Sequence, residues 1–177
     1  MTAQTKTILQ TTLAGGVLVA AVAFGVARWR AASRVGEEGL RVFFYDESEQ
    51  RLYAVPRETL APHVGVGGAR DDGVRAVVVA AESEQHDPSQ QRIAYLEKYT
   101  PELKGFLEER RAARAAGRPP RQPMPSSEGE FFDVNTLVRR PGEDIWYDLT
   151  QPEARRITLE WHQWRSADGR ALVVCVP

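Results

Sequence analysis

The side chains best suited to acid–base or metal chemistry lie far apart in the chain. His63, His86 and His162 form no HxxxH or HExxH pair, the spacing that places two metal ligands on one face of a helix. Glu160 and His162 flank Trp161; on a strand they share a face, whereas on a helix they point about 200° apart. We therefore expect solvent-exposed histidines, and the pattern predicts neither a catalytic residue nor a metal site.

The other reactive or chelating groups have no supporting motif. The serines lie in polar stretches without the G-x-S-x-G setting of a nucleophile. Cys175 is the single cysteine, which excludes an intrachain disulfide and a CxxC zinc site, and its apolar surroundings are typical of an inert buried thiol. Glu82, Glu84 and Asp87 offer oxygen ligands for a hard cation, but their spacing matches no calcium loop. A solvated loop and no cofactor are predicted.

Charge is distributed unevenly along the chain. The 177 residues carry a net charge of −1, and the 42% hydrophobic and 27% charged residues are typical of a globular protein. The first 36 residues hold four of the 23 basic residues and none of the 24 acidic ones, so the remainder has a net charge of −5. Because such a domain repels phosphates, the composition argues against a general nucleic-acid binder.

An uncharged segment near the N-terminus predicts a membrane anchor. Residues 8–27 carry no charge and, as a helix, are just long enough to cross about 30 Å of hydrocarbon. The rival is a cleaved signal peptide, for which Ala21-Val22-Ala23 supplies a cleavage pattern, whereas Arg28 and Arg30 directly after the segment favour retention. The predicted organisation is a tail (1–6), a transmembrane helix (7–27), a juxtamembrane linker (28–40) and a soluble domain (41–177).

Small residues recur on one face of the predicted transmembrane helix, namely Gly16, Ala20, Ala23 and Ala27. This spacing permits close packing against another helix, of the same chain or of a partner, but it also arises in any Ala-rich anchor. The side of the membrane is contested. The linker carries three arginines, whereas the tail on the other side of the segment carries Lys6. By the positive-inside rule this difference places the domain in the cytoplasm, whereas the usual insertion route of a signal anchor places it outside.

The first half of the soluble domain predicts strands followed by a helix. Residues 41–46 and 51–56 are rich in aromatic and branched side chains around a short polar loop, a β-hairpin pattern, and residues 74–81 predict a buried strand. Residues 92–99 alternate as a strand does, or lead into the next helix. That helix starts at Thr100, with Pro101 in its first position, and stops at Gly117.

The second half predicts a Pro-rich arm, a hairpin, a helix and a strand. Four prolines exclude regular structure over 117–129, so we expect an exposed tether or flap there. A second hairpin follows from Phe131-Phe132 to Leu149, and residues 150–153 fit a capping box for a second helix. Residues 171–176 predict a last buried strand. The fold class is α+β, a small and mostly antiparallel sheet with two helices.

Aromatic side chains gather near the C-terminal end, namely Trp146, Tyr147, Trp161 and Trp164. Ala154, Ile157 and the last two tryptophans fall on one helical face, which favours a role in the core. The alternative is a set of partner-binding anchors, because Trp and Tyr are enriched in interface hot spots.

Several segments together resemble a group of uncharacterised membrane-anchored proteins from planctomycete-type bacteria. The segments are the FFYD hairpin, GVRAVVV, RIAYLEKYTPE, the LVRRPG hairpin with its Trp, and the terminal Cys-x-Pro. The resemblance covers residues 41–177 and implies membrane attachment but no activity. Its members often carry a cysteine pair after the GVRA strand, where this chain reads AAESEQHD, so a metal or redox role of that pair does not carry over.

These patterns favour a single-pass, non-catalytic interaction or structural subunit of a membrane-associated assembly, with the membrane and other proteins as partners. Two rivals stay open. One is an anchored hydrolase or metal-dependent enzyme using Glu160 and His162 or the 82–87 loop. The other is a module that binds a small ligand or peptide at a sheet edge or the aromatic group.

Overall fold

The computed structural model describes residues 39–68 and 71–177. The chain divides into two compact units, Met1–Leu40 and Arg41–Pro177, and the fold below is that of the second unit. The predicted transmembrane helix, with Gly16, Ala20, Ala23 and Ala27, lies outside the described residues. Within the described ranges, no helix is long and apolar enough to span a bilayer.

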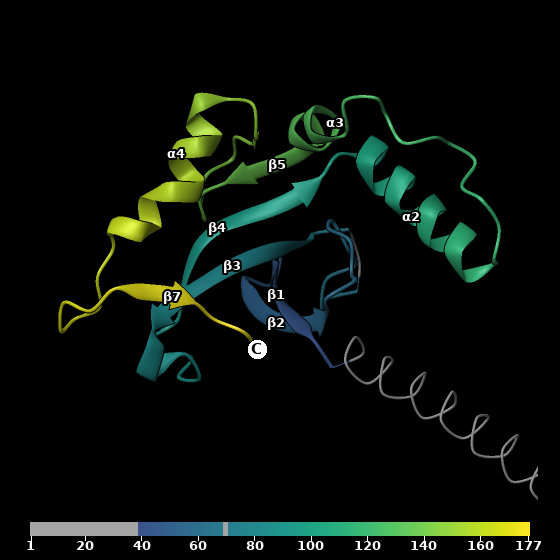
Figure 1. Ribbon diagram of the computed structural model, residues 1–177. Coiled ribbons are helices and arrows are strands. Elements are labelled where there is room, and N and C mark those ends of the chain that lie inside the picture. Colours follow the sequence, from purple (N-terminus) through teal and green to yellow (C-terminus); the bar gives the residue numbers. More distant parts are fainter. Residues whose placement is uncertain (1–38, 69–70) are drawn as a thin grey trace, which may run out of the picture. The chain divides into compact units, whose positions relative to one another are not determined.

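The second unit is an α+β fold built on one antiparallel sheet, with strand order β2-β1-β3-β4-β5-β6 (Figure 1). The strands are β1 (Arg41–Asp46), β2 (Arg51–Pro56), β3 (Gly73–Ala81), β4 (Arg92–Tyr99), β5 (Thr136–Arg139), β6 (Tyr147–Asp148) and β7 (Leu172–Val174). β3 is the long central strand. β1 pairs with its beginning and β7 with its end, so these two strands share one edge of β3, while β4 takes the other edge.

The strands of the first half form where the sequence predicts them. β1 and β2 make the expected hairpin, with Arg41 opposite Pro56 and Asp46 opposite Arg51. β3 has both faces covered, which explains its continuous run of small and branched apolar residues. The segment 92–99, for which strand and helix start both remained open, is strand β4.

A buried carboxylate fixes the turn of the first hairpin. Asp46 Oδ1 accepts hydrogen bonds from the backbone N–H groups of Ser48 (3.0 Å) and Glu49 (2.9 Å), and Oδ2 accepts one from Gly67 (3.2 Å). These bonds, the one from Glu49 first, lower the pKa of Asp46 to about 2 although burial opposes the shift. Asp46 therefore ties the β1–β2 turn to the loop that precedes β3.

The described residues contain three α-helices rather than the predicted two: α2 (Pro101–Ala115), α3 (Glu128–Asn135) and α4 (Pro152–Glu160). Single 3-10 turns lie at Glu82–Glu84 and Trp161–Gln163. α2 begins as predicted, because Thr100 Oγ1 accepts a hydrogen bond from the N–H of Leu103 (3.3 Å) and Pro101 occupies the first turn. The same hydroxyl donates to Asn135 Oδ1 (2.5 Å), which joins the start of α2 to the end of α3.

The prediction for residues 128–135 was wrong. Phe131 and Phe132 belong to α3 and not to the second hairpin, and the Pro-rich segment is accordingly shorter than predicted. Tertiary packing decides this, because the ring of Phe131 packs edge-on against Phe106 of α2, with ring centroids 5.3 Å apart. The hairpin that follows is reduced to β5 and the two-residue β6.

Two further predictions need correction. The capping box at 150–153 does not form, because the Thr150 hydroxyl donates to Asp148 and α4 starts after Gln151 without a side-chain cap. The last strand is shorter than 171–176 and only partly buried. Val174 is 49% exposed because β7 lies at an edge of the sheet, whereas Cys175 is buried as predicted.

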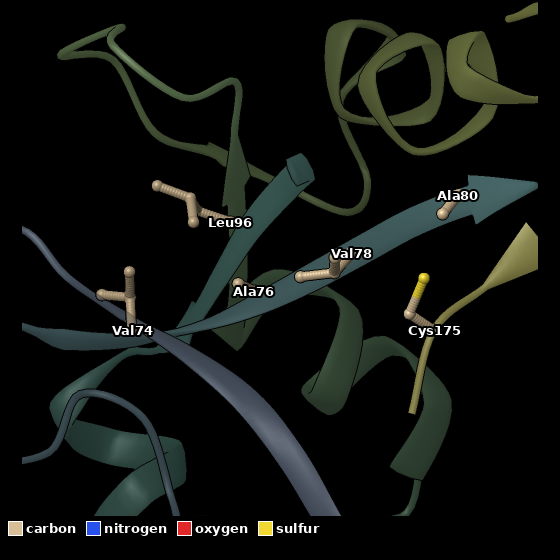
Figure 2. Packing of buried hydrophobic residues seen from close by; sticks show 6 residues of the cluster. All are labelled: Val74, Ala76, Val78, Ala80, Leu96 and Cys175. Atoms are coloured by element: carbon tan, nitrogen blue, oxygen red, sulfur yellow. The ribbon is translucent and has the colours of Figure 1, made fainter. Parts of the chain in front are cut away.

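The core occupies both faces of the sheet. Side chains of β3 alternate, so Val78 and Val79 point to opposite faces. On one face Val78 joins Val74, Ala76, Ala80, Leu96 and Cys175, whose sulfur points toward β3 (Figure 2). On the other face, Val79 packs with Ala94 and Trp161. Farther along the sheet, α4 places Ala154 and Ile157 against Val138 of β5.

Candidate functional site

The Glu160 and His162 pair predicted as one rival active site is engaged in structural contacts. Glu160 lies at the end of α4 and accepts two hydrogen bonds from the Arg140 guanidinium, both 2.8 Å. Arg140 also donates to Glu153 (2.9 Å), and Glu160 is the main cause of the raised pKa of Arg140. The His162 ring stacks on Trp161, with centroids 3.8 Å apart. Arg140 therefore fastens the end of β5 to α4 through these carboxylates.

The 82–87 loop is likewise held by its own contacts. Glu84 accepts a hydrogen bond from Arg170 (2.9 Å), and Asp87 accepts from the hydroxyl (2.7 Å) and N–H (2.9 Å) of Ser89. These bonds from Ser89 lower the pKa of Asp87. In residues 39–68 and 71–177, no group of three or more His, Cys, Asp or Glu side chains is arranged to hold a metal ion.

The four aromatic residues named from the sequence lie on both faces of the sheet. Trp161 is 9% exposed and packs with Val79, so it belongs to the core, and the half-buried Trp164 packs against the same cluster. Tyr147 packs beside Val138 and Ile157. Trp146 packs on the opposite face, against the cluster of Val78 and Leu96. The structure therefore brings Trp161 and Trp164 together and separates Trp146 from them.

A groove with a volume of about 570 Å³ lies between α2 and the Pro-rich arm. The arm runs back from the end of α2 to the start of α3 (Figure 1). Glu109 of α2 anchors it: Oε1 accepts from the Arg118 guanidinium (2.8 Å) and from the N–H of Arg121 (3.0 Å), and the bond from Arg118 is the main cause of the lowered pKa of Glu109. The arm is therefore attached to α2.

The groove has mixed chemistry. Its walls combine apolar rings with polar side chains, and its lining residues are Glu102, Gly105, Phe106, Glu109, Arg121, Gln122, Pro123, Pro125 and Phe131. Sequence reasoning missed this site, because Glu109 and Arg121 are twelve residues apart with no periodic relation and only the folded arm brings them together. Gly105, in the middle of a predicted helix, was the one local signal of an unusual position.

A second group missed by the sequence surrounds Trp146. Lys98 of β4 and Arg139 of β5 lie over its ring, with Lys98 Nζ 4.1 Å and Arg139 Cζ 4.6 Å from the centroid. Arg139 also forms an ion pair with Glu47 from the β1–β2 turn. Burial lowers the pKa of both Lys98 and Arg139. The alternation of residues 92–99 already placed Lys98 on the face of the core residue Leu96, which was an available signal for a half-buried lysine.

Neither site can be named by comparison with known proteins. The chain was compared with family models, with curated proteins and with solved structures, and no match was found. The resemblance to membrane-anchored proteins of planctomycete-type bacteria stays a prediction. Any functional assignment therefore rests on the sequence itself and on the geometry of the described residues.

Proposed function

We propose that this chain is a single-pass membrane protein and a non-catalytic subunit of a larger membrane-associated assembly, in which the groove between α2 and the arm binds a segment of a partner protein. The uncharged residues 8–27 supply the anchor. The domain then presents the groove to proteins at the membrane surface.

The observation that carries the proposal is Gly105. It lies in the interior of α2, is exposed, and lines the groove. A glycine there costs about 1 kcal/mol of helix stability relative to alanine. Apart from its chain neighbours and the backbone of α2 itself, a Cβ at this position would meet no atom of the described chain within 4 Å, so packing inside the domain does not require the glycine. A partner that approaches the backbone of α2 closely does require it.

The groove is also formed before any partner arrives. Glu109 holds the arm on α2, and Phe106 of α2 packs on Phe131 of α3, so little ordering entropy is lost on binding.

The test uses the full-length chain in its native membranes, with a photoreactive amino acid in place of Gln122 in the arm. The matched control carries it in place of Arg156 on α4, which is exposed and does not line the groove. We expect one dominant crosslinked product from position 122 and none from position 156, and we expect Gly105→Leu to remove it.

Two results would contradict the proposal. Equal crosslinking from both positions, or a product that survives Gly105→Leu in a protein with unchanged thermal unfolding, would exclude the groove as the binding surface. A chain that stays in the supernatant after high-speed centrifugation without detergent would exclude the anchor.

A further inference from the structure

A second cavity lies where β4 runs into α2, with a volume of about 360 Å³. This volume falls in the usual range of small-molecule sites, roughly 300–1,000 Å³. Its walls are mainly apolar, formed by Pro62, Tyr99, Pro101 and Leu137. We call it the Lys98 pocket, because Lys98 contributes the charge that distinguishes it.

The charges in the Lys98 pocket do not balance. Lys104 Nζ donates to the Pro62 carbonyl oxygen (2.6 Å) and lies 3.6 Å from the Asp71 carboxylate, so its charge is compensated. Lys98 has no carboxylate within ion-pair distance among the described residues. The Lys98 residue is half-buried, and its ammonium group lies on the Trp146 ring, 4.1 Å from the centroid. Among the charged residues that line the cavity, Lys98 is thus the one without a carboxylate partner in the described part of the chain.

We propose that the Lys98 pocket binds a small monocarboxylate with an apolar body. The carboxylate lies against Lys98 Nζ, which offers hydrogen-bond donors, and the attraction between the two charges is stronger in a half-buried site than in water. The apolar body lies against Pro62, Tyr99 and Leu137. A phosphate dianion fits less well, because its second charge would find no free cation among the described lining residues and would face Asp71.

The experiment is calorimetric titration of the full-length chain in mild detergent with benzoate, hexanoate, benzamide and inorganic phosphate. Benzamide has nearly the shape of benzoate without the charge. We expect saturable binding of at least one acid, no measurable binding of benzamide, and at least tenfold weaker binding of that acid to Lys98→Met, which keeps most of the apolar stem.

Arg92→Met is the matched control. Arg92 lies on the same strand and also stacks on a tryptophan, with Cζ 4.5 Å from the Trp164 ring, but it does not line the pocket. We expect it to bind the acid as the wild type does. Failure of both acids to saturate, benzamide binding equal to benzoate, phosphate binding tighter than both acids, or unchanged affinity in Lys98→Met would each overturn the proposal.

A measurement on the wild-type chain covers the case in which Lys98→Met does not fold. Amine acylation is followed by peptide mass spectrometry at Lys6, Lys98 and Lys104 with and without benzoate. Protection of Lys98 that increases with benzoate, with Lys6 unchanged as the internal reference, is expected. Equal labelling of Lys98 with and without saturating acid would overturn the assignment.

Discussion

Gly105→Ala should stabilise α2 and weaken binding of the proposed partner, so this one substitution separates the two roles of the position. Alanine is more favourable than glycine by about 0.8–1.0 kcal/mol in a helix interior. Outside the backbone of α2 itself, the new Cβ meets no described atom within 4 Å, so no clash offsets this gain. For a domain of this size the thermal midpoint should rise by roughly 3–5 °C. The same methyl group overpacks the proposed contact between the α2 backbone and the partner, which should weaken the free energy of binding by about 1–3 kcal/mol.

Two quantities are measured for each variant, namely the thermal midpoint of the purified chain in mild detergent and the crosslinking yield from position 122 in native membranes. Gly129→Ala is the control, because Gly129 is also a helical glycine with open space at its Cβ position but does not line the groove. It should raise the midpoint, by less because it lies in the first turn of α3, and leave crosslinking unchanged. A lower midpoint in Gly105→Ala, or undiminished crosslinking, would refute the reasoning.

Three further predictions concern the fold. Ile157→Ala removes three buried carbons from the contact between α4 and the sheet and should lower the free energy of unfolding by about 2–5 kcal/mol, measured with denaturant. The control is Leu159→Ala on the same helix, where the side chain is 49% exposed and the change should be less than about 0.5 kcal/mol. Similar values for the two variants would contradict the packing of α4. Because the pKa of Asp46 is about 2 in the folded chain, below its ordinary 3.8, its contribution is present above pH 3.8 and lost as the pH falls toward 2. The difference in thermal midpoint between wild type and Asp46→Asn should therefore shrink over that interval, and a pH-independent difference would exclude the charged hydrogen bonds. Thr100→Ala removes the α2 cap and the bond to Asn135 and should cost about 0.5–2 kcal/mol, measured by the same unfolding assay against Thr158→Ala, whose hydroxyl bonds only within its own helix.

Sequence patterns predicted the parts of the fold that neighbouring residues determine. The aromatic and branched residues of β1 and β2 specify strands around a polar turn, and Thr100-Pro101 specifies a helix start. Gly117, with φ of +64°, ends α2 because a residue without a side chain adopts this conformation without strain. Each of these signals acts within a few residues, so no tertiary information is needed to interpret it.

The rest depended on contacts between distant residues. The short apolar pair Phe131-Phe132 fits a strand or a helix, and only the packing of Phe131 on Phe106 selects α3. Thr150 resembled a capping residue, but Asp148 competes for its hydroxyl. The groove requires the Glu109 contact with the arm, and the Lys98 pocket requires the loop at Pro62 to meet β4 and α2. Composition could not reveal either cavity, because their polar groups come from separate segments.

The groove and the Lys98 pocket both border α2, yet they can be tested independently. No lining residue is common to the two cavities, and even the neighbours Lys104 and Gly105 belong to different ones. Successive residues of a helix point about 100° apart, which places the pocket and the groove on different sides of α2. Lys98→Met should therefore weaken acid binding at least tenfold and leave crosslinking from position 122 intact, whereas Gly105→Leu should remove the crosslinking and leave acid binding unchanged. If one substitution removed both acid binding and crosslinking while thermal unfolding stayed unchanged, α2 would present a single continuous binding surface, and the assignment of two separate ligands would be wrong.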